Sequence, residues 1–216
     1  MGDSPVLNTP QLILITDSSR LPGTALLEQI DLALQGGVDT VLMREKQLDS
    51  AKALALASSL RSLTHTHQAR LIIHSFADIA LAVGADGVHL PSNEMATIPA
   101  LRLWLIQNDA PSDMAISVSC HHADDLAQAA AFGVDFALLS PVFETASHPG
   151  EPCLGIDAFH TLADPAACPI VALGGIDTHN RYVLPHHGVA VISALLMADD
   201  ARGTAQLLRS GFKPLT

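Results

Sequence analysis

The stretch "AISVSCHHADDLAQAAAFGVDFALLS", residues 115–140, decides the fold because it holds one complete strand–helix–strand unit. Its ends, "AISVS" (115–119) and "FALLS" (136–140), are short β-branched or aliphatic runs. Between them, "ADDLAQAAAFG" (123–133) has a polar start, an alanine-rich body and a closing glycine, which is typical of a helix. Continuous apolar strands that alternate with helices predict a parallel sheet covered on both faces.

The same pattern recurs along the whole chain, at intervals of about 20 to 30 residues. Eight such units in about 200 residues predict a (βα)8 barrel (TIM barrel), with an open doubly wound sheet as the structural alternative. No linker interrupts the pattern, so residues 1–216 are expected to form a single domain. The eight expected strands are "LILIT" (12–16), "TVLMRE" (40–45), "RLIIH" (70–74), "GVHLP" (87–91), "AISVS" (115–119), "FALLS" (136–140), "IVALGG" (170–175) and "VAVIS" (189–193).

The acidic charge balance limits the partners of the chain. Eleven basic and 22 acidic residues give a formal net charge of −11, which repels nucleic acids and anionic membranes. The N-terminal residues lack the basic region followed by an apolar run that a signal peptide has, and no apolar run approaches the roughly 18 residues of a membrane span. A cytoplasmic protein is therefore expected. Three cysteines without metal-type spacing are expected to be free thiols. Apolar helix faces favour a homodimer.

The last two strands end in a segment suited to an anion. In a barrel, the carboxyl ends of the strands and the loops after them form the site. "ALGGID" (172–177) places two glycines where the backbone can approach an anion closely, and "VIS" (191–193) ends the next strand. The sequence therefore predicts a phosphate site here, with a tight turn that binds nothing as the alternative.

Charged and titratable side chains follow the other strands. Arg44 and Lys46 lie on one side of an extended segment, and they predict an anionic ligand unless they pair with Glu45 or Asp17. Histidines at three strand ends are candidates for acid–base chemistry, and a metal site built from them is the weaker alternative. These histidines are His74, His89 and His121, and the further polar residues expected to face a ligand are Ser119, Ser140, Thr145 and His148.

The chain resembles the thiamine phosphate synthase and TenI superfamily over nearly its whole length. The resemblance is carried by "GVDTVLMREK" (37–46), "ADGVHL" (85–90) and "PIVALGGID" (169–177), in this order. It implies that Gly174, Gly175, Ile192 and Ser193 hold a substrate phosphate and that Arg44 and Lys46 line the pocket.

The synthase of this superfamily joins a pyrimidine diphosphate to a thiazole phosphate with Mg²⁺. Several positions of this chain depart from the sequence pattern of that enzyme. Leu42 replaces a glutamine, "HS" (74–75) replaces "ND", and "PSNE" (91–94) replaces "GQED", leaving Glu94 at the metal position. His148 stands where the synthase has a lysine. The histidine of the TenI branch just before "VFET" is Pro141 here.

These departures favour a TenI-like isomerase that transfers protons on a thiazole phosphate or a related phosphorylated heterocycle without a metal. His121, His89 and His74 are then the candidate catalytic residues, and no cofactor is expected. A diverged thiamine-phosphate synthase, with Glu94 as a ligand of Mg²⁺, is one alternative. A binder of a phosphorylated ligand without catalysis is the other.

Overall fold

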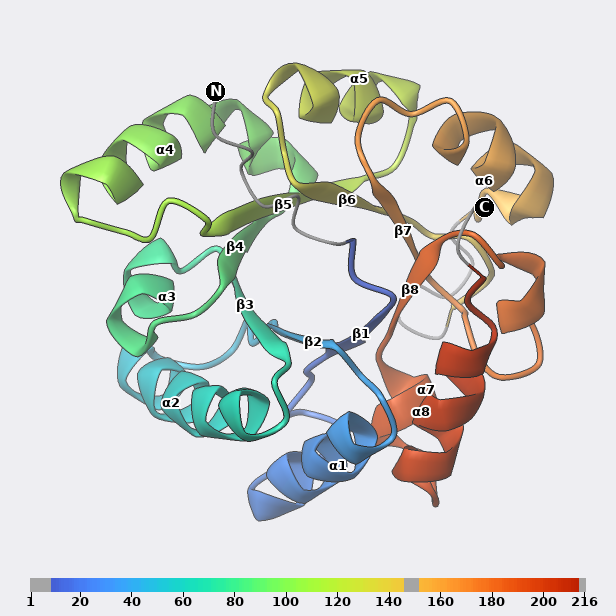
Figure 1. Ribbon diagram of the computed structural model, residues 1–216, viewed down its shortest axis with the longest axis horizontal. Helices are drawn as coiled ribbons and strands as arrows, with labels where there is room; N and C mark the ends of the chain where they lie inside the picture. Colours follow the sequence, from blue (N-terminus) through green and yellow to red (C-terminus); the bar gives the residue numbers. More distant parts are fainter. Residues whose placement is uncertain (1–8, 146–151, 214–216) are drawn as a thin grey trace.

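Eight parallel strands form a closed ring, and helices surround it (Figure 1). This computed structural model describes residues 9–145 and 152–213 of the chain. Each strand pairs with the next along the sequence, and β1 closes the ring on β8 with Ile13 beside Ala190. The predicted (βα)8 barrel is confirmed and the open sheet is wrong. The strands are β1 (Leu12–Ile15), β2 (Thr40–Met43), β3 (Arg70–His74), β4 (Gly87–Leu90), β5 (Ala115–Cys120), β6 (Phe136–Leu139), β7 (Ile170–Leu173) and β8 (Gly188–Val191).

Helices follow the strands at every step except one. Between β7 and β8 the chain forms only a short 3₁₀ turn, η2 (Arg181–Val183), while two helices follow β8. A second 3₁₀ turn, η1 (Ser92–Thr97), precedes the helix after β4. The helices are α1 (Thr24–Gln35), α2 (Ser50–Thr66), α3 (Ala77–Val83), α4 (Ile98–Gln107), α5 (Ala123–Ala131), α6 (Gly155–Ala163), α7 (Ser193–Leu196) and α8 (Ala201–Ser210).

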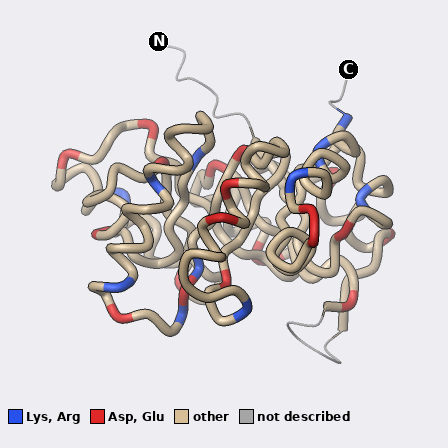
Figure 2. The backbone as a smooth tube through the Cα atoms, turned by 90° about the horizontal axis from the view of Figure 1, so that it is seen from below, with Lys and Arg blue, Asp and Glu red and all other residues tan. Residues whose placement is uncertain are grey.

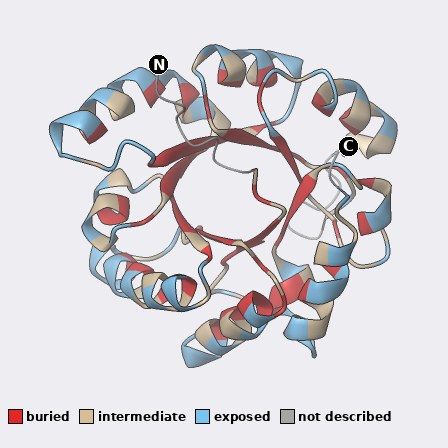
Figure 3. Cartoon of the chain, in the orientation of Figure 1, coloured by how far each residue is buried: buried red, intermediate tan, exposed pale blue. Residues whose placement is uncertain are grey.

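The strands separate two apolar layers. Alternate side chains such as Ile13 and Ile15 belong to a cluster inside the barrel, whereas Leu12 and Leu14 pack toward the helices. Figure 3 shows this arrangement as a buried ring of strands, with helices buried mainly on their inner faces. Each fully buried leucine or isoleucine contributes about 1.5–3 kcal/mol to folding. The apolar strand runs of the sequence are therefore explained by burial on both sides.

Three aspartates fasten neighbouring strands at the amino-terminal end of the barrel. Asp135, just before β6, accepts a hydrogen bond from the backbone N–H of Ile116 at 2.8 Å and donates its own N–H to the carbonyl of Ile116 at 2.9 Å. Asp86 makes the same reciprocal pair with Leu71, at 2.7 and 2.8 Å. Asp39, before β2, binds the start of β1 in the same way. These reciprocal hydrogen bonds hold the register of β1 with β2, of β3 with β4 and of β5 with β6 at the point where the second strand of each pair begins.

Basic and acidic residues are spread over the whole chain rather than gathered in one block. In Figure 2 the acidic and basic positions are interspersed along the outside, and most of the tube carries neither. Within residues 9–145 and 152–213, no helix combines the length and the apolar character that crossing a bilayer requires.

Removal of the Asp135 carboxylate tests its role in the register. In Asp135→Ala the buried N–H of Ile116 loses its acceptor, and we expect the free energy of unfolding to fall by about 1–3 kcal/mol in urea denaturation. Asp135→Asn keeps an acceptor oxygen, so its free energy of unfolding should fall clearly less than that of Asp135→Ala. The exposed Asp113→Ala should change stability by less than about 0.5 kcal/mol. Equal losses in all three variants would contradict this role.

Candidate active site

One large cavity, of about 920 Å³, opens at the carboxyl ends of the strands. Ile15, Leu42, Leu138 and Leu173 form its apolar part and come from four different strands. Strand ends and the loops after them supply the polar part, as expected for an active site in a barrel. The polar and charged lining residues are Asp17, Arg20, Arg44, Lys46, His74, Ser75, His89, Ser92, Asn93, Glu94, Ser119, His121, Ser140 and Thr145.

A smaller pocket of about 380 Å³ adjoins the large cavity at the ends of β7 and β8. Gly174, Gly175, Ile192 and Ser193 line it, together with Thr145. Thr145, Gly174 and Ile192 also line the large cavity, so the two spaces share a wall. The structure therefore brings the residues expected to bind phosphate into one hollow beside the larger one.

The glycines allow the loop after β6 to pack against the end of β7. Both have positive φ, 105° for Gly174 and 64° for Gly175. A Cβ atom on Gly174 would lie 2.7 Å from the Cα of Pro141, and one on Gly175 would lie 2.8 Å from the Cβ of Phe143. The N–H of Phe143 donates to the carbonyl of Gly174 at 3.0 Å.

This packing leaves two backbone donors available at the small pocket. Within the described residues, no hydrogen bond uses the N–H groups of Gly174 or Gly175. Free backbone N–H groups of successive residues in a turn are a common means of binding anions. The structure therefore shows the tight turn, with two backbone donors that no protein group uses among the described residues, and the phosphate site stays a prediction.

Arg44 and Lys46 extend into the large cavity without a carboxylate partner among the described residues. Both side chains expected as alternatives are occupied elsewhere. Glu45 accepts hydrogen bonds from Ser18, and Asp17 forms an ion pair with Arg20 at 2.7 Å. Arg44 is half-buried and Lys46 is exposed, so both charges remain in reach of water and of a ligand. Two positive charges on one cavity wall favour an anionic ligand by direct attraction.

His89 lies inside the barrel between two serines. Its Nδ1 is 2.9 Å from the Ser117 hydroxyl and its Nε2 is 2.9 Å from the Ser119 hydroxyl, and only 2% of the residue is exposed. Burial, followed by the charges of His74 and Arg44, lowers the pKa of His89 to about 3. The imidazole is therefore neutral at pH 7. Ser117 was missed at the sequence level, although a period of two places it on the same face as Ser119.

His74 stands beside His89, with ring centroids 5.7 Å apart. Its Nδ1 is 3.0 Å from the Ser75 hydroxyl. Burial, and then the charges of Arg44 and Lys46, lowers the pKa of His74 to about 4. At neutral pH both histidines can form hydrogen bonds to a ligand, but neither carries a proton to donate as an imidazolium.

The remaining predicted residues lie mostly around the same cavity. His121 is exposed, and its Nδ1 binds the carbonyl oxygen of Ser140 at 2.9 Å, so this nitrogen carries the hydrogen. Ser119, Ser140 and Thr145 line the wall. His148 lies outside the described residues.

Carboxylates are scarce in the large cavity. Asp17 and Glu94 line it, and Asp17 already binds Arg20. Mg²⁺ requires oxygen ligands in near-octahedral geometry. Among the described residues, no group of three His, Cys, Asp or Glu side chains converges at this cavity. Glu94 alone does not fit a site that holds Mg²⁺ before substrate binds.

Known proteins resemble this chain over nearly its full length. The family model described as "Thiamine monophosphate synthase" matches residues 12–195. A putative thiamine-phosphate synthase of Geobacter sulfurreducens is 40% identical over 210 residues, covering 95% of each chain. A thiamine-phosphate synthase of Syntrophomonas wolfei is 35% identical and covers 92% of this chain and 94% of its own. Thiamine phosphate pyrophosphorylase from Pyrococcus furiosus superposes with a TM-score of 0.80 at 28% identity, covering 93% of this chain and 94% of its own.

These relatives correct the function expected from the sequence. The TenI-like isomerase interpretation is wrong, because chains 35–40% identical over more than nine-tenths of this one are named as synthases. The expectation came from the departures from the synthase pattern, and the histidines give a physical reason against it. Their types and positions suggested proton transfer near neutral pH, whereas burial and neighbouring cations keep His74 and His89 uncharged.

The lowered pKa of His89 makes stability depend on pH. In the unfolded chain His89 binds a proton below its ordinary pKa of 6.5, but in the folded protein only near pH 3. Stability therefore falls as pH falls from 7 toward 3, by about 2 kcal/mol between pH 7 and pH 5 for this group. Urea denaturation at pH 7 and at pH 5 gives the free energy of unfolding at each pH. We expect the decrease from pH 7 to pH 5 to be about 2 kcal/mol smaller in His89→Gln than in the wild type.

His179→Gln is the matched control, because the side chain of His179 is 91% exposed. It should show the same pH dependence as the wild type. If His89→Gln also matches the wild type, His89 titrates normally and the burial argument fails.

Proposed function

This chain belongs to the thiamine monophosphate synthase family, and we propose that it joins a pyrimidine diphosphate to a thiazole phosphate and releases pyrophosphate. The observation that carries the proposal is the pair of adjoining pockets, each equipped for one anion. The large cavity offers Arg44 and Lys46, and the small pocket offers the backbone N–H groups of Gly174 and Gly175. Two anionic substrates can thus bind side by side.

The proposed placement follows from charge and size. The diphosphate lies toward Arg44 and Lys46, where two full positive charges meet its higher negative charge. The thiazole phosphate extends its single phosphate into the small pocket, between the glycines and Ser193. The shared wall at Thr145 and Ile192 then brings the two ring systems together. Such positioning supplies much of the acceleration when two bound substrates react.

The coupling requires no proton transfer. The lone pair of the thiazole nitrogen forms a bond to the methylene carbon attached to the pyrimidine, and the carbon–oxygen bond to the diphosphate breaks. The bonding electrons leave with pyrophosphate, and the nitrogen becomes a cationic thiazolium nitrogen. His74 and His89, neutral at pH 7, suit this chemistry as hydrogen-bonding groups. Arg44 and Lys46 stabilise the charge that develops on the leaving pyrophosphate.

Mg²⁺ is the cofactor that the family resemblance implies, and in this reaction it would neutralise the diphosphate. The residues of the cavity do not fit a preformed site for it, since Glu94 is the one lining carboxylate without an ion pair among the described residues. The steps assigned above therefore rest on the two cations and the backbone N–H groups.

Release of pyrophosphate tests the proposal directly. In a buffer that contains Mg²⁺, we expect the untagged protein to release pyrophosphate only when the pyrimidine diphosphate and the thiazole phosphate are both present. Lys46→Ala should lower kcat/KM by about 10- to 150-fold, because a charge-assisted contact contributes about 1.5–3 kcal/mol.

Lys52→Ala is the control, since Lys52 lies on the exposed side of α2 and pairs with Asp49. Its kcat/KM should stay within twofold of the wild type. Should the wild type bind thiazole phosphate yet release no pyrophosphate, the chain is a binder and the synthase proposal is overturned. Equal activity of Lys46→Ala and the wild type would remove Lys46 from the diphosphate site.

A further inference from the structure

Two histidines and an aspartate gather at the amino-terminal end of the barrel, away from the large cavity. His160 lies on α6, Asp164 follows the end of that helix, and His187 directly precedes β8. The Asp164 Oδ1 atom is 2.9 Å from Nε2 of His187 and 3.3 Å from Nδ1 of His160. Among the described residues, this is the one group of three such side chains whose ligand atoms all lie within 4.8 Å of one another.

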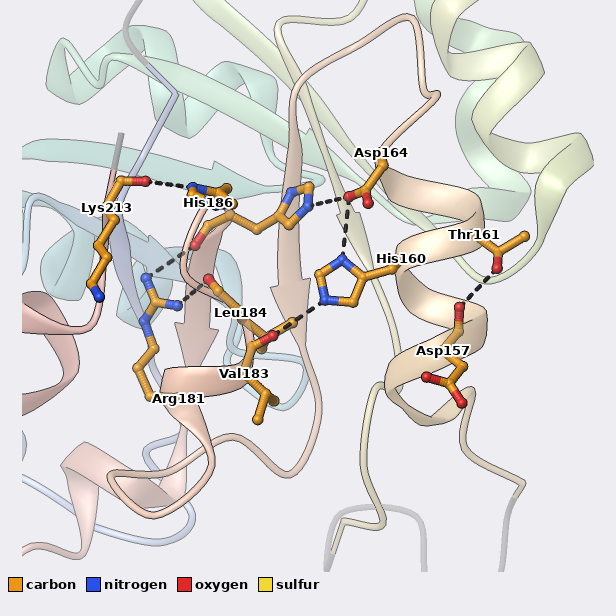
Figure 4. A network of polar contacts seen from close by, with 10 residues as sticks. Asp157, His160, Thr161, Asp164, Arg181, Val183, Leu184, His186 and Lys213 are labelled. Carbon is orange, nitrogen blue, oxygen red and sulfur yellow. Dashed lines mark hydrogen bonds and ion pairs between the residues drawn. The ribbon is translucent and has the colours of Figure 1, made fainter. Parts of the chain in front are cut away.

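The hydrogen bonds of His160 determine which nitrogen faces the aspartate with a lone pair. Its Nε2 is 3.2 Å from the carbonyl oxygen of Val183, which only accepts hydrogen bonds, so Nε2 carries the hydrogen (Figure 4). In the neutral ring, Nδ1 then directs a lone pair at the carboxylate of Asp164. Two lone pairs that face each other at 3.3 Å repel, and a positive charge between them, either a proton or a metal ion, would remove that repulsion.

Surrounding contacts hold these side chains in place. Arg181 is buried, and its guanidinium donates to the backbone carbonyls of Leu184, His187 and Leu208. The Phe159 ring packs edge-on against both histidine rings, at centroid distances of 5.5 and 5.1 Å. A histidine that donates one ring nitrogen to a carbonyl and offers the other inward has the usual arrangement of a metal ligand. The cluster is therefore organised before any ion binds.

From this geometry, we propose that His160, Asp164 and His187 bind one divalent transition-metal ion, of which Zn²⁺ is the best fit, with water completing the coordination. Nitrogen and oxygen ligands in this ratio suit Zn²⁺ or Co²⁺, and they disfavour Mg²⁺ and Ca²⁺. Tetrahedral Zn²⁺ places neighbouring ligand atoms roughly 3.3 Å apart. The distance of 3.3 Å between Nδ1 of His160 and Oδ1 of Asp164 already matches this value. The distance of 2.9 Å between Nε2 of His187 and the same oxygen has to increase slightly.

The bound ion would fasten α6 to the segment before β8. This segment replaces the missing helix between β7 and β8, and it has only the short η2 turn of its own. Asp164 is 59% exposed, so water can reach the ion. The role is structural, and it is independent of the chemistry proposed for the large cavity.

Metal binding is tested on the full-length, untagged protein after treatment with EDTA. Zn²⁺ is titrated against a chromophoric chelator, with Cys153→Ser in every variant because the Cys153 thiol is exposed. We expect one ion per chain at micromolar affinity or tighter, together with a higher Tm. His160→Gln and His187→Gln should each weaken binding at least tenfold, about 1.4 kcal/mol.

The adjacent His186 provides the matched control, since its Nδ1 binds the carbonyl of Lys213 at 2.9 Å and does not face Asp164. His186→Gln should bind Zn²⁺ as the wild type does. Binding of Co²⁺ to the wild type gives a readout that does not depend on folding of the variants, because tetrahedral nitrogen and oxygen ligation produces intense visible absorption.

Two results would overturn the proposal. One is the absence of stoichiometric binding by the wild type, in which case a proton fills the gap between His160 and Asp164. The other is affinity in His160→Gln and His187→Gln equal to that of the His186→Gln control, with circular dichroism showing all three folded.

Discussion

Three reciprocal hydrogen-bond pairs at the amino-terminal end of the barrel, made by Asp39, Asp86 and Asp135, hold the register of β1 with β2, β3 with β4 and β5 with β6. A slip of one residue would turn every inward side chain outward. In the observed register His74 lies beside His89, and His89 lies beside Ser117. The place of His74 beside His89 thus agrees with the Asp86 pair at the opposite end of β3 and β4, whereas His89 meets Ser117 through the direct pairing of β4 with β5.

That register also determines the electrostatics of the cavity. His74 and His89 are inward residues of β3 and β4, and the Arg44 and Lys46 side chains reach the same space after β2. Burial is the main cause that lowers the pKa of both histidines. Arg44 and Lys46 add to it for His74, and His74 and Arg44 add to it for His89. The same cations make the site attractive to anions, although the chain as a whole carries a formal charge of −11. One arrangement therefore favours phosphate binding and disfavours proton transfer by these histidines.

Most of the fold could be predicted from the sequence, because burial on both sides of each strand leaves an apolar run. "RLIIH" (70–74), for example, is β3 with the same bounds. "IVALGG" (170–175) was too long, since positive φ at Gly174 and Gly175 ends β7 at Leu173. The function was harder to predict, because the pKa of His89 depends on neighbours from other strands. No local pattern indicates that Ser117 and Arg44 surround it.

The segment between β7 and β8 connects the two ends of the barrel. Near the small pocket, Asn180 donates to the carbonyl of Gly175 at 2.8 Å and accepts from the N–H of Asp177 at 2.9 Å. The next residue, Arg181, is held at the other end by three backbone carbonyls. Because only a short η2 turn supports this segment, its order depends on such side-chain contacts more than on helix formation. Through Asn180 and Arg181, this one short segment therefore contacts both the backbone of Gly175 at the small pocket and the backbone of His187 before β8.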